Sequence, residues 1–247
     1  MLRQEIDKIA GWLQEQVKAA NAKGLVVGVS GGVDSAVAAA LIKRACPQNS
    51  LGVIIPISSD PQDLIDARLV VKKLGLDAFE LDLTHEHQSM IEKVWRKLER
   101  CGQSREPSRR MADANLRARL RMCAWYTAAN ALNYLVVGTD NKAEYFIGYF
   151  TKYGDGGCDL LPLVDFTKGE IYAMADILGI PEQILAKQPS AGLWPGQTDE
   201  AEIGATYQEI DAYLEGRQIP DRDREIIESL HERSRHKRAL PPAYRRS

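Results

Sequence analysis

Cysteine is scarce and widely spaced in this 247-residue sequence. Its four cysteines form no Cys-x-x-Cys pair and lie at Cys46, Cys101, Cys123 and Cys158. This distribution excludes a disulfide framework and a zinc knuckle, so we expect buried or incidental thiols. The sequence also lacks any run approaching the roughly 18 apolar residues that span a bilayer, and its first segment lacks the apolar stretch of an export signal. We therefore expect a cytoplasmic protein with no membrane partner.

A large excess of either charge is also missing. The formal net charge is −2, with 32 Lys and Arg against 34 Asp and Glu, which excludes a globally basic nucleic-acid binder. The charge is nevertheless uneven, because residues 91–121 hold ten basic and four acidic side chains and the tail from His231 holds six and one. Each basic region could bind an anionic ligand or form a solvated face. No nucleic acid is expected as a partner.

Strand and helix patterns alternate along the first two thirds of the chain. Short apolar runs rich in β-branched residues predict buried strands at 25–30, 51–57, 78–83 and 134–139. Other segments predict helices at 2–20, 33–45, 63–74, 90–98 and 115–132. Such alternation is typical of an α/β fold with a doubly wound, mostly parallel sheet flanked by helices.

The last third carries helix patterns without further strand patterns. Helices are expected at 168–178, 199–214 and 222–232, joined by connections rich in Pro and Gly. We expect one domain over residues 1–247, with a nucleotide-binding α/β core over about 24–165 and a C-terminal helical lobe over about 166–247. Two polar segments, 101–111 and 187–198, are typical of binding loops or lids.

A candidate phosphate loop follows the first predicted strand and opens a helix. It reads Ser30-Gly31-Gly32-Val33-Asp34-Ser35, and open α/β sheets bind ligands at this end of their strands. Glycines let the backbone approach an oxyanion, a helix N-terminus favours negative charge, and an aspartate supplies a hard oxygen for a phosphate-bound cation. The loop fits neither the Walker pattern nor Gly-x-Gly-x-x-Gly. The alternative is a plain glycine-rich turn.

The hexapeptide resembles the pyrophosphate loop of the N-type ATP pyrophosphatases, which have an adenine nucleotide alpha hydrolase-like fold and cleave ATP between the α- and β-phosphates. Further segments resemble the ammonia-dependent NAD⁺ synthetases of that class, and these lie at 115–122, 138–144, 148–159, 189–200 and 236–238. The resemblance implies ATP-dependent amidation of deamido-NAD⁺ to NAD⁺, the final step of NAD⁺ biosynthesis. Ammonia would be the nitrogen donor, an NAD-adenylate the intermediate, and AMP and pyrophosphate the other products. The resemblance also implies Mg²⁺ and a homodimer.

Site residues follow from the resemblance by matching position. The expected ATP contacts are Gly28, Val29, Ser30, Gly31, Gly32, Val33, Asp34, Ser35, Thr139, Lys168 and Ser190. The expected Mg²⁺ ligands are Asp34 and Glu144, beside which Asp140 adds an acid. The expected deamido-NAD⁺ contacts are Arg119, Lys152, Asp159, His236 and Lys237. No covalent nucleophile is expected, because adenylation itself turns a carboxylate oxygen into a good leaving group.

Taken without the resemblance, several of these residues have a second interpretation. Glu144 could be an exposed acid at a helix start, and Lys168 a surface lysine. Arg119 could belong to a solvated helix face. His236 and Lys237 could belong to a surface tail.

Two other classes of protein remain open from the residues alone. One is a different pyrophosphate-loop enzyme, such as a tRNA-modifying thiolase or a nucleotide amidotransferase subunit. The spacing of the cysteines argues against the thiolase, and 247 residues leave no room for a fused glutaminase. The other class is a non-catalytic nucleotide-binding module of the universal-stress or electron-transfer-flavoprotein type. Two metal-binding carboxylates argue against such a module.

Overall fold

The sheet is parallel and has four strands. The computed structural model describes residues 1–103, 109–190 and 198–246. Its strands are β1 (Gly24–Gly28), β2 (Ser50–Ile54), β3 (Asp77–Glu80) and β4 (Tyr134–Val137), in the order β3-β2-β1-β4. Every pair is parallel, which confirms the predicted fold class. Because the chain runs from β1 to β2 and β3 before β4 adds to the other side of β1, the strand order reverses at β1 and β4.

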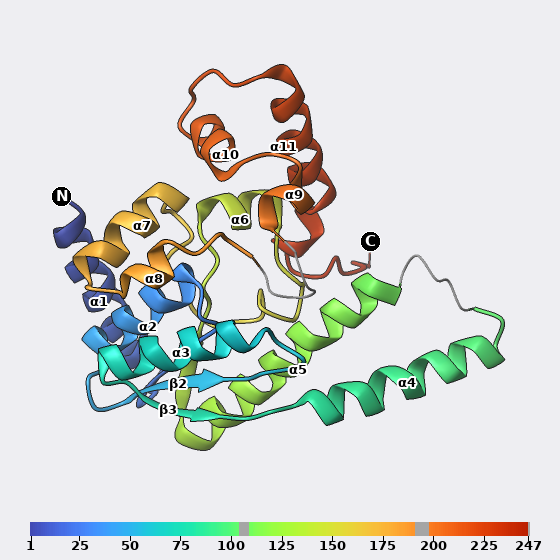
Figure 1. Ribbon diagram of the computed structural model, residues 1–247, viewed down its shortest axis with the longest axis horizontal. Coiled ribbons are helices and arrows are strands. Elements are labelled where there is room, and N and C mark those ends of the chain that lie inside the picture. The colour runs from blue at the N-terminus through green and yellow to red at the C-terminus, as the bar shows by residue number, and fades with distance from the viewer. Residues whose placement is uncertain (104–108, 191–197, 247) are drawn as a thin grey trace.

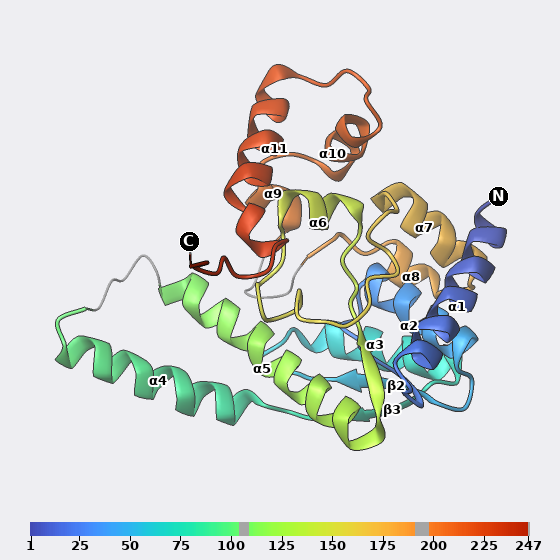
Figure 2. The same ribbon diagram turned by 180° about the vertical axis from the view of Figure 1, so that it is seen from behind.

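Helices cover both faces of the sheet because side chains alternate along a strand. Leu25 and Val27 of β1 pack into a core with α1 (Leu2–Ala19), α2 (Val33–Ala45) and α7 (Lys168–Ile177). Val26 faces the other way, into a core that includes residues of α5 (Arg109–Leu132). Figures 1 and 2 show α1 and α2 on the opposite side of the strands from α5.

The remaining helices frame this centre. They are α3 (Pro61–Leu74), α4 (Thr84–Arg100), α6 (Lys142–Ile147), α8 (Glu182–Leu185), α9 (Asp199–Ile203), α10 (Tyr207–Leu214) and α11 (Asp221–Arg233). In both views α4 extends away from the rest of the molecule (Figures 1 and 2). His87 is the buried residue of α4, so most of this amphipathic helix is accessible.

A second hydrophobic cluster forms the upper lobe in Figure 1. It joins α6 to α10 and α11 through residues that include Ile147, Ile210 and Ile227. Ile171 of α7 and Ile184 of α8 instead pack in the core that β1 forms with α1 and α2, which we call the sheet-side core. The division of the chain near residue 165 remains a prediction. Helix α6 precedes residue 165 but packs with the C-terminal helices α10 and α11, whereas α7 follows residue 165 but packs with α1 and α2.

Three predicted helices differ from the structure by more than two residues. The helix expected over 199–214 is two, because Gly204 ends α9 in the left-handed region at φ 86° and Thr206 starts α10 with a capping box to Glu209. Helix α4 begins at Thr84 rather than at residue 90, and α5 at Arg109 rather than at residue 115. Much of the segment 187–198 predicted as a loop lies outside the described residues. None of the described helices is long and apolar enough to cross a membrane.

Candidate functional site

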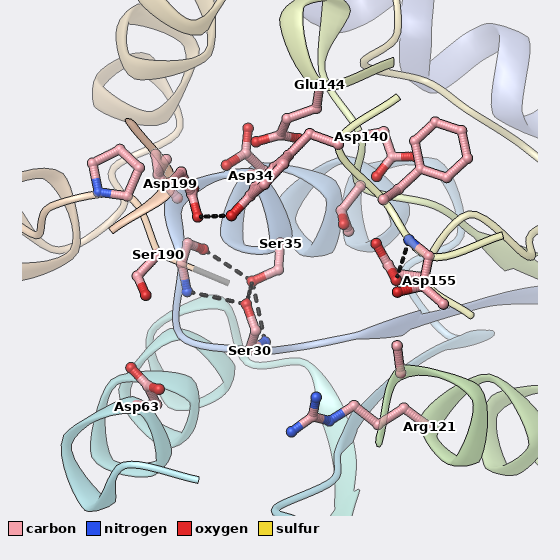
Figure 3. Close-up of a pocket in the computed structure, with 18 of the residues that line it drawn as sticks. Ser30, Asp34, Ser35, Asp63, Arg121, Asp140, Glu144, Asp155, Ser190 and Asp199 are labelled. Atoms are coloured by element: carbon pink, nitrogen blue, oxygen red, sulfur yellow. Dashed lines mark hydrogen bonds between the residues drawn. The ribbon is translucent and has the colours of Figure 1, made fainter. Parts of the chain in front are cut away.

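A cleft of about 350 Å³ opens at the carboxyl ends of β1 and β4. This is the point where the strand order reverses, and open α/β sheets bind their ligands there. Figure 3 shows Asp34, Asp140 and Glu144 grouped on one side of the cleft, with Arg121 across from them and the two serines of the loop between. The sequence therefore brings its phosphate-loop motif to the expected edge of the sheet.

Local hydrogen bonds fix the phosphate loop. The Ser35 hydroxyl donates to the Gly32 carbonyl at 2.9 Å and accepts from the Ser30 backbone N–H at 3.2 Å. Gly31 has φ +87°, and a Cβ there would lie 2.5 Å from the Asp63 carbonyl oxygen. Only glycine fits this approach of the loop to α3. The loop ends at the N-terminus of α2, where backbone N–H groups favour an anion.

Asp34 and Glu144 converge on one cation. The ammonium of Lys168 lies 2.6 Å from Oδ2 of Asp34 and 3.3 Å from Oε1 of Glu144. The amide of Asn141 donates to the other oxygen of Asp34 at 2.9 Å, and the backbone N–H of Asn141 donates to Oε2 of Glu144 at 3.2 Å. Two carboxylates from the first turns of α2 and α6, each fixed by a second contact, supply the hard oxygen ligands that Mg²⁺ prefers.

Burial sets the protonation of this group. Burial raises the pKa of Glu144 to about 7, against the opposing effect of the Lys168 ammonium. Burial lowers the pKa of Lys168, but Asp34 and Glu144 outweigh it and hold the pKa above its ordinary value. Lys168 therefore stays positively charged at this position. Its side chain is only 5% exposed, which excludes the interpretation of Lys168 as a surface lysine.

Tyr207 links Glu144 to Asp199 of α9, and Tyr149 contacts the same aspartate. The hydroxyl of Tyr207 lies 2.8 Å from Oε1 of Glu144 and 3.1 Å from Oδ2 of Asp199. The hydroxyl of Tyr149 lies 3.1 Å from Oδ1 of Asp199 and 2.8 Å from Oε2 of Glu202. Burial, followed by the neighbouring carboxylates, raises the pKa of each phenol above its ordinary value, so both remain neutral hydrogen-bond donors.

Four further charged side chains line the cleft, and these are Asp140, Asp155, Lys237 and Arg121. Burial raises the pKa of Asp155 and, well above the usual range, that of Asp140. The ammonium of Lys237 donates to the backbone carbonyls of Gly148 at 2.8 Å and Phe150 at 2.6 Å. Burial lowers the pKa of Arg121 to about 10. Its guanidinium donates to the Ile55 carbonyl at 3.0 Å.

Most of the predicted ATP contacts and both predicted metal ligands line the cleft. Gly28 and Gly31 do not appear in its wall, while the other nine predicted ATP residues and Glu144 do. Gly28 instead allows the close approach of Trp125, whose ring would lie 2.3 Å from a Cβ at that position.

The predicted deamido-NAD⁺ contacts are less concentrated. Of these, Lys237 lines the cleft. Arg119 lies beside it, where its guanidinium donates to the Lys152 carbonyl, and the Lys152 ammonium donates to the His236 carbonyl. Asp159 turns away, accepting from the Tyr126 hydroxyl at 2.9 Å and the Val136 N–H at 2.8 Å. Arg119, Lys152 and His236 are thus linked to one another, and none of them is among the residues that line the cleft.

The structure adds residues that the sequence patterns did not single out. They are Arg121, Tyr149, Asp155, Lys187, Asp199 and Tyr207. Lys187 bridges Asp63 at 2.6 Å and Asp66 at 2.7 Å beside the phosphate loop. Arg121 lies in the 115–122 segment of the family resemblance, but no role was predicted for it. Tyr207 carried no signal, because an aromatic residue at a helix start is typical of a core. Tyr149 lies in the 148–159 segment of the family resemblance, but no role was predicted for it.

Known proteins resemble this chain over nearly its whole length. The NAD synthase family model matches residues 5–241. An NH(3)-dependent NAD(+) synthetase from Alkaliphilus oremlandii is 52% identical over 242 residues, which are 98% of this chain and 97% of the relative.

Solved structures agree with the sequence comparison. An NMN synthetase from Francisella tularensis has a TM-score of 0.92 at 36% identity, covering 99% of this chain and 98% of that one. An NH3-dependent NAD synthetase from Campylobacter jejuni has a TM-score of 0.77 at 27% identity and covers 99% of both chains. The likeness thus extends from the phosphate loop to the C-terminal lobe.

Proposed function

The chain belongs to the NAD synthase family, and we propose that the cleft beside its phosphate loop is where it makes NAD⁺ from deamido-NAD⁺, ATP and ammonia. The resemblance drawn from the sequence is thereby confirmed. One observation supports this location: the carboxylates of Asp34 and Glu144 both contact the ammonium of Lys168, at the point where the strand order reverses. A plain glycine-rich turn would need neither carboxylate.

The residues present fit a role for Mg²⁺ held by Asp34 and Glu144. Seven carboxylates and four basic side chains line the cleft among the described residues. Even with Asp140, Asp155 and Glu144 protonated, the remaining four acids equal the four basic side chains in number, so the cleft offers a polyanionic nucleotide no net attraction unless further cations enter with it. Bound Mg²⁺ supplies such charge and neutralises phosphate oxygens during transfer. The carboxylate oxygens of Asp34 and Glu144 are ligands of the right chemical type.

The chain's own groups then account for the first half-reaction. The loop 30–35 and the N-terminus of α2 hold the β- and γ-phosphates, and Lys168 neutralises charge that develops as pyrophosphate leaves. A nicotinate carboxylate oxygen bonds to the α-phosphorus while the bond from that phosphorus to the pyrophosphate oxygen breaks. Ammonia next bonds to the carbonyl carbon, AMP leaves with the former carboxylate oxygen, and the nitrogen loses a proton. Positioning and charge neutralisation suffice, so no protein nucleophile is needed.

An experiment with labelled nitrogen tests the overall reaction. The protein is incubated with Mg-ATP, deamido-NAD⁺ and ¹⁵N-ammonium, and the products are analysed by mass. The expected product is NAD⁺ carrying ¹⁵N in its amide, together with AMP and pyrophosphate. Omission of ammonium should abolish the product. Turnover that yields unlabelled NAD⁺, or none from a folded protein, would contradict the proposal.

A mononucleotide is a second candidate substrate. The structural likeness to an NMN synthetase, with a TM-score of 0.92, exceeds that to the Campylobacter NAD synthetase, with 0.77. Both reactions amidate a nicotinate carboxylate, so the same cleft serves either one. The values of kcat/KM for deamido-NAD⁺ and nicotinate mononucleotide, measured side by side, decide between them. A higher value for the mononucleotide would assign the chain to the second reaction.

We further propose that the active form is a homodimer built on α4 and α5. Large apolar side chains are exposed on these helices at Met90, Val94, Met111 and Leu132. Arg119 lies on α5 outside the cleft wall, so a second copy on this face would enclose it. Val94→Glu should yield a monomer in analytical ultracentrifugation and weaken dinucleotide binding more than ATP binding. A native dimer that Val94→Glu leaves intact would contradict the use of this face. A cytoplasmic location stays a prediction.

A further inference from the structure

Tyr207 reaches from the C-terminal lobe into the acid pair. It is the first residue of α10 and is 4% exposed. Its ring packs in the second hydrophobic cluster with Ala143 and Ile147, both on α6. Helix α6 also carries Glu144, so the ring rests on the element that presents the carboxylate. Packing of this kind needs only the ring, and phenylalanine would satisfy it.

The hydroxyl makes contacts that packing does not explain. It lies 2.8 Å from Oε1 of Glu144 and 3.1 Å from Oδ2 of Asp199. A phenol has one proton to donate, and the shorter distance is to Glu144. A buried hydroxyl costs free energy unless it is hydrogen-bonded, and here the partner is a carboxylate of the proposed metal site.

Glu144 is thereby held at both of its oxygens. Its Oε2 accepts from the backbone N–H of Asn141, which closes a capping box within α6. Its Oε1 faces Tyr207 and, at 3.3 Å, the Lys168 ammonium. The contact with Asn141 is local in sequence, whereas Tyr207 lies 63 residues away from Glu144. Removing the phenol would leave Oε1 without its hydrogen bond from the lobe.

The ring of Tyr207 also places Lys168. The ammonium lies 4.5 Å from the ring centroid, within the range of a favourable cation–π interaction. Tyr207 therefore contacts both Glu144 and Lys168, the lysine that bridges Glu144 and Asp34. From these contacts we propose that Tyr207 is a positioning residue, which fixes Glu144 and Lys168 in the arrangement that binds the metal and the ATP phosphates. This inference rests on the proposed role of Asp34 and Glu144.

The test compares two hydroxyl deletions on one helix. Tyr207→Phe keeps the ring and removes the hydroxyl. Tyr213→Phe is the matched control, because Tyr213 also lies on α10 and donates to a carboxylate, that of Glu228 at 3.2 Å, outside the cleft. Binding of Mn²⁺ alone is measured by electron paramagnetic resonance on the folded proteins, and thermal unfolding is recorded for each.

We expect Tyr207→Phe to raise the Kd for Mn²⁺ about tenfold, as is typical for loss of a partner that orients a metal ligand. Tyr213→Phe should leave the Kd unchanged, and both variants should unfold within a few degrees of the parent protein. An unchanged Kd in Tyr207→Phe, or an equal rise in Tyr213→Phe, would overturn the inference.

Two further variants separate this inference from the metal assignment. If Asp34→Asn leaves Mn²⁺ binding unchanged, the metal site itself is wrong and the inference falls with it. If Asp34→Asn weakens binding but Tyr207→Phe does not, the role of Tyr207 alone is wrong. In a Glu144→Gln background, Tyr207→Phe should cause no further loss. A further tenfold loss there would show that Tyr207 acts elsewhere.

Discussion

The ammonium of Lys168 lies 2.6 Å from the carboxylate of Asp34, although 134 residues separate them in sequence. Asp34 is in the first turn of α2 and Lys168 is the first residue of α7. The two helices pack side by side in the sheet-side core. Their N-termini therefore present one acid and one base to the same cleft, and both helix ends favour the phosphates of a nucleotide.

Asp34→Asn should separate adenylation from substrate binding. The amide keeps the size of the side chain but removes the charge that Lys168 and a metal would share. We expect formation of AMP and pyrophosphate to fall at least about 100-fold, while the Kd for deamido-NAD⁺ changes little. Rapid-quench kinetics and equilibrium binding measure the two quantities. Equal losses in both would contradict the metal role.

Arg119→Ala should act on the dinucleotide. Its guanidinium lies outside the cleft wall beside Lys152, so ATP has no direct contact with it in our account. We expect the KM for deamido-NAD⁺ to rise about tenfold, the scale of a lost charge-assisted hydrogen bond, with the KM for ATP unchanged. Arg3→Ala, which removes an exposed arginine of α1, is the control. A change in the KM for ATP alone would contradict the assignment of Arg119 to the deamido-NAD⁺ site.

Gly31→Ala should damage the phosphate loop, and Gly179 offers a matched comparison. Both glycines have positive φ, at +87° and +71°, but a Cβ at Gly179 meets nothing within 4 Å. Gly179→Ala should cost about 1 kcal/mol of unfolding free energy from its backbone conformation alone. Gly31→Ala should cost more and abolish AMP formation, because its Cβ meets the Asp63 carbonyl at 2.5 Å. Equal effects in urea unfolding would contradict the steric argument.

Asp66 should make stability depend on acid pH. Burial raises its pKa, but hydrogen bonds from Lys187, Gln62 and Gln183 outweigh burial and hold the pKa below its ordinary value. Its contribution is therefore complete above about pH 4, the ordinary aspartate value, and is lost as the pH falls through the lowered pKa. The difference in unfolding free energy between the parent and Asp66→Asn should shrink from pH 6 to pH 2.5. A difference that is constant over this range would contradict the assignment.

Local sequence signals predicted β1, the phosphate loop and α2, but they were not used to predict α6. The apolar run before Gly28, the diglycine turn and the alanine-rich helix after it identified β1, the loop and α2, because each is specified by neighbouring residues. Asn141 and Glu144 form a capping box at the start of α6, which is a local signal of a helix, yet no helix was predicted there. The prediction of one helix over 199–214 likewise did not include the break at Gly204, where Thr206 and Glu209 form the capping box of a second helix.

Long-range contacts were beyond such signals. Nothing near Lys168 in sequence indicates that its ammonium is buried between two acids, and only the packing of α7 against α2 brings it there. Tyr207 reaches Glu144 from another lobe by the same route. The family resemblance supplied Lys168 and Glu144, but it did not supply Tyr207, whose role depends on how the lobe sits on α6.

The most direct test of the account follows one oxygen atom. Deamido-NAD⁺ labelled with ¹⁸O in its nicotinate carboxylate is turned over with Mg-ATP and ammonia, and the phosphorus products are analysed by mass and ³¹P NMR. Attack of the carboxylate on the α-phosphorus predicts one ¹⁸O in AMP and none in pyrophosphate. Formation of ADP and orthophosphate, or of AMP without the label, would contradict the chemistry assigned to this cleft.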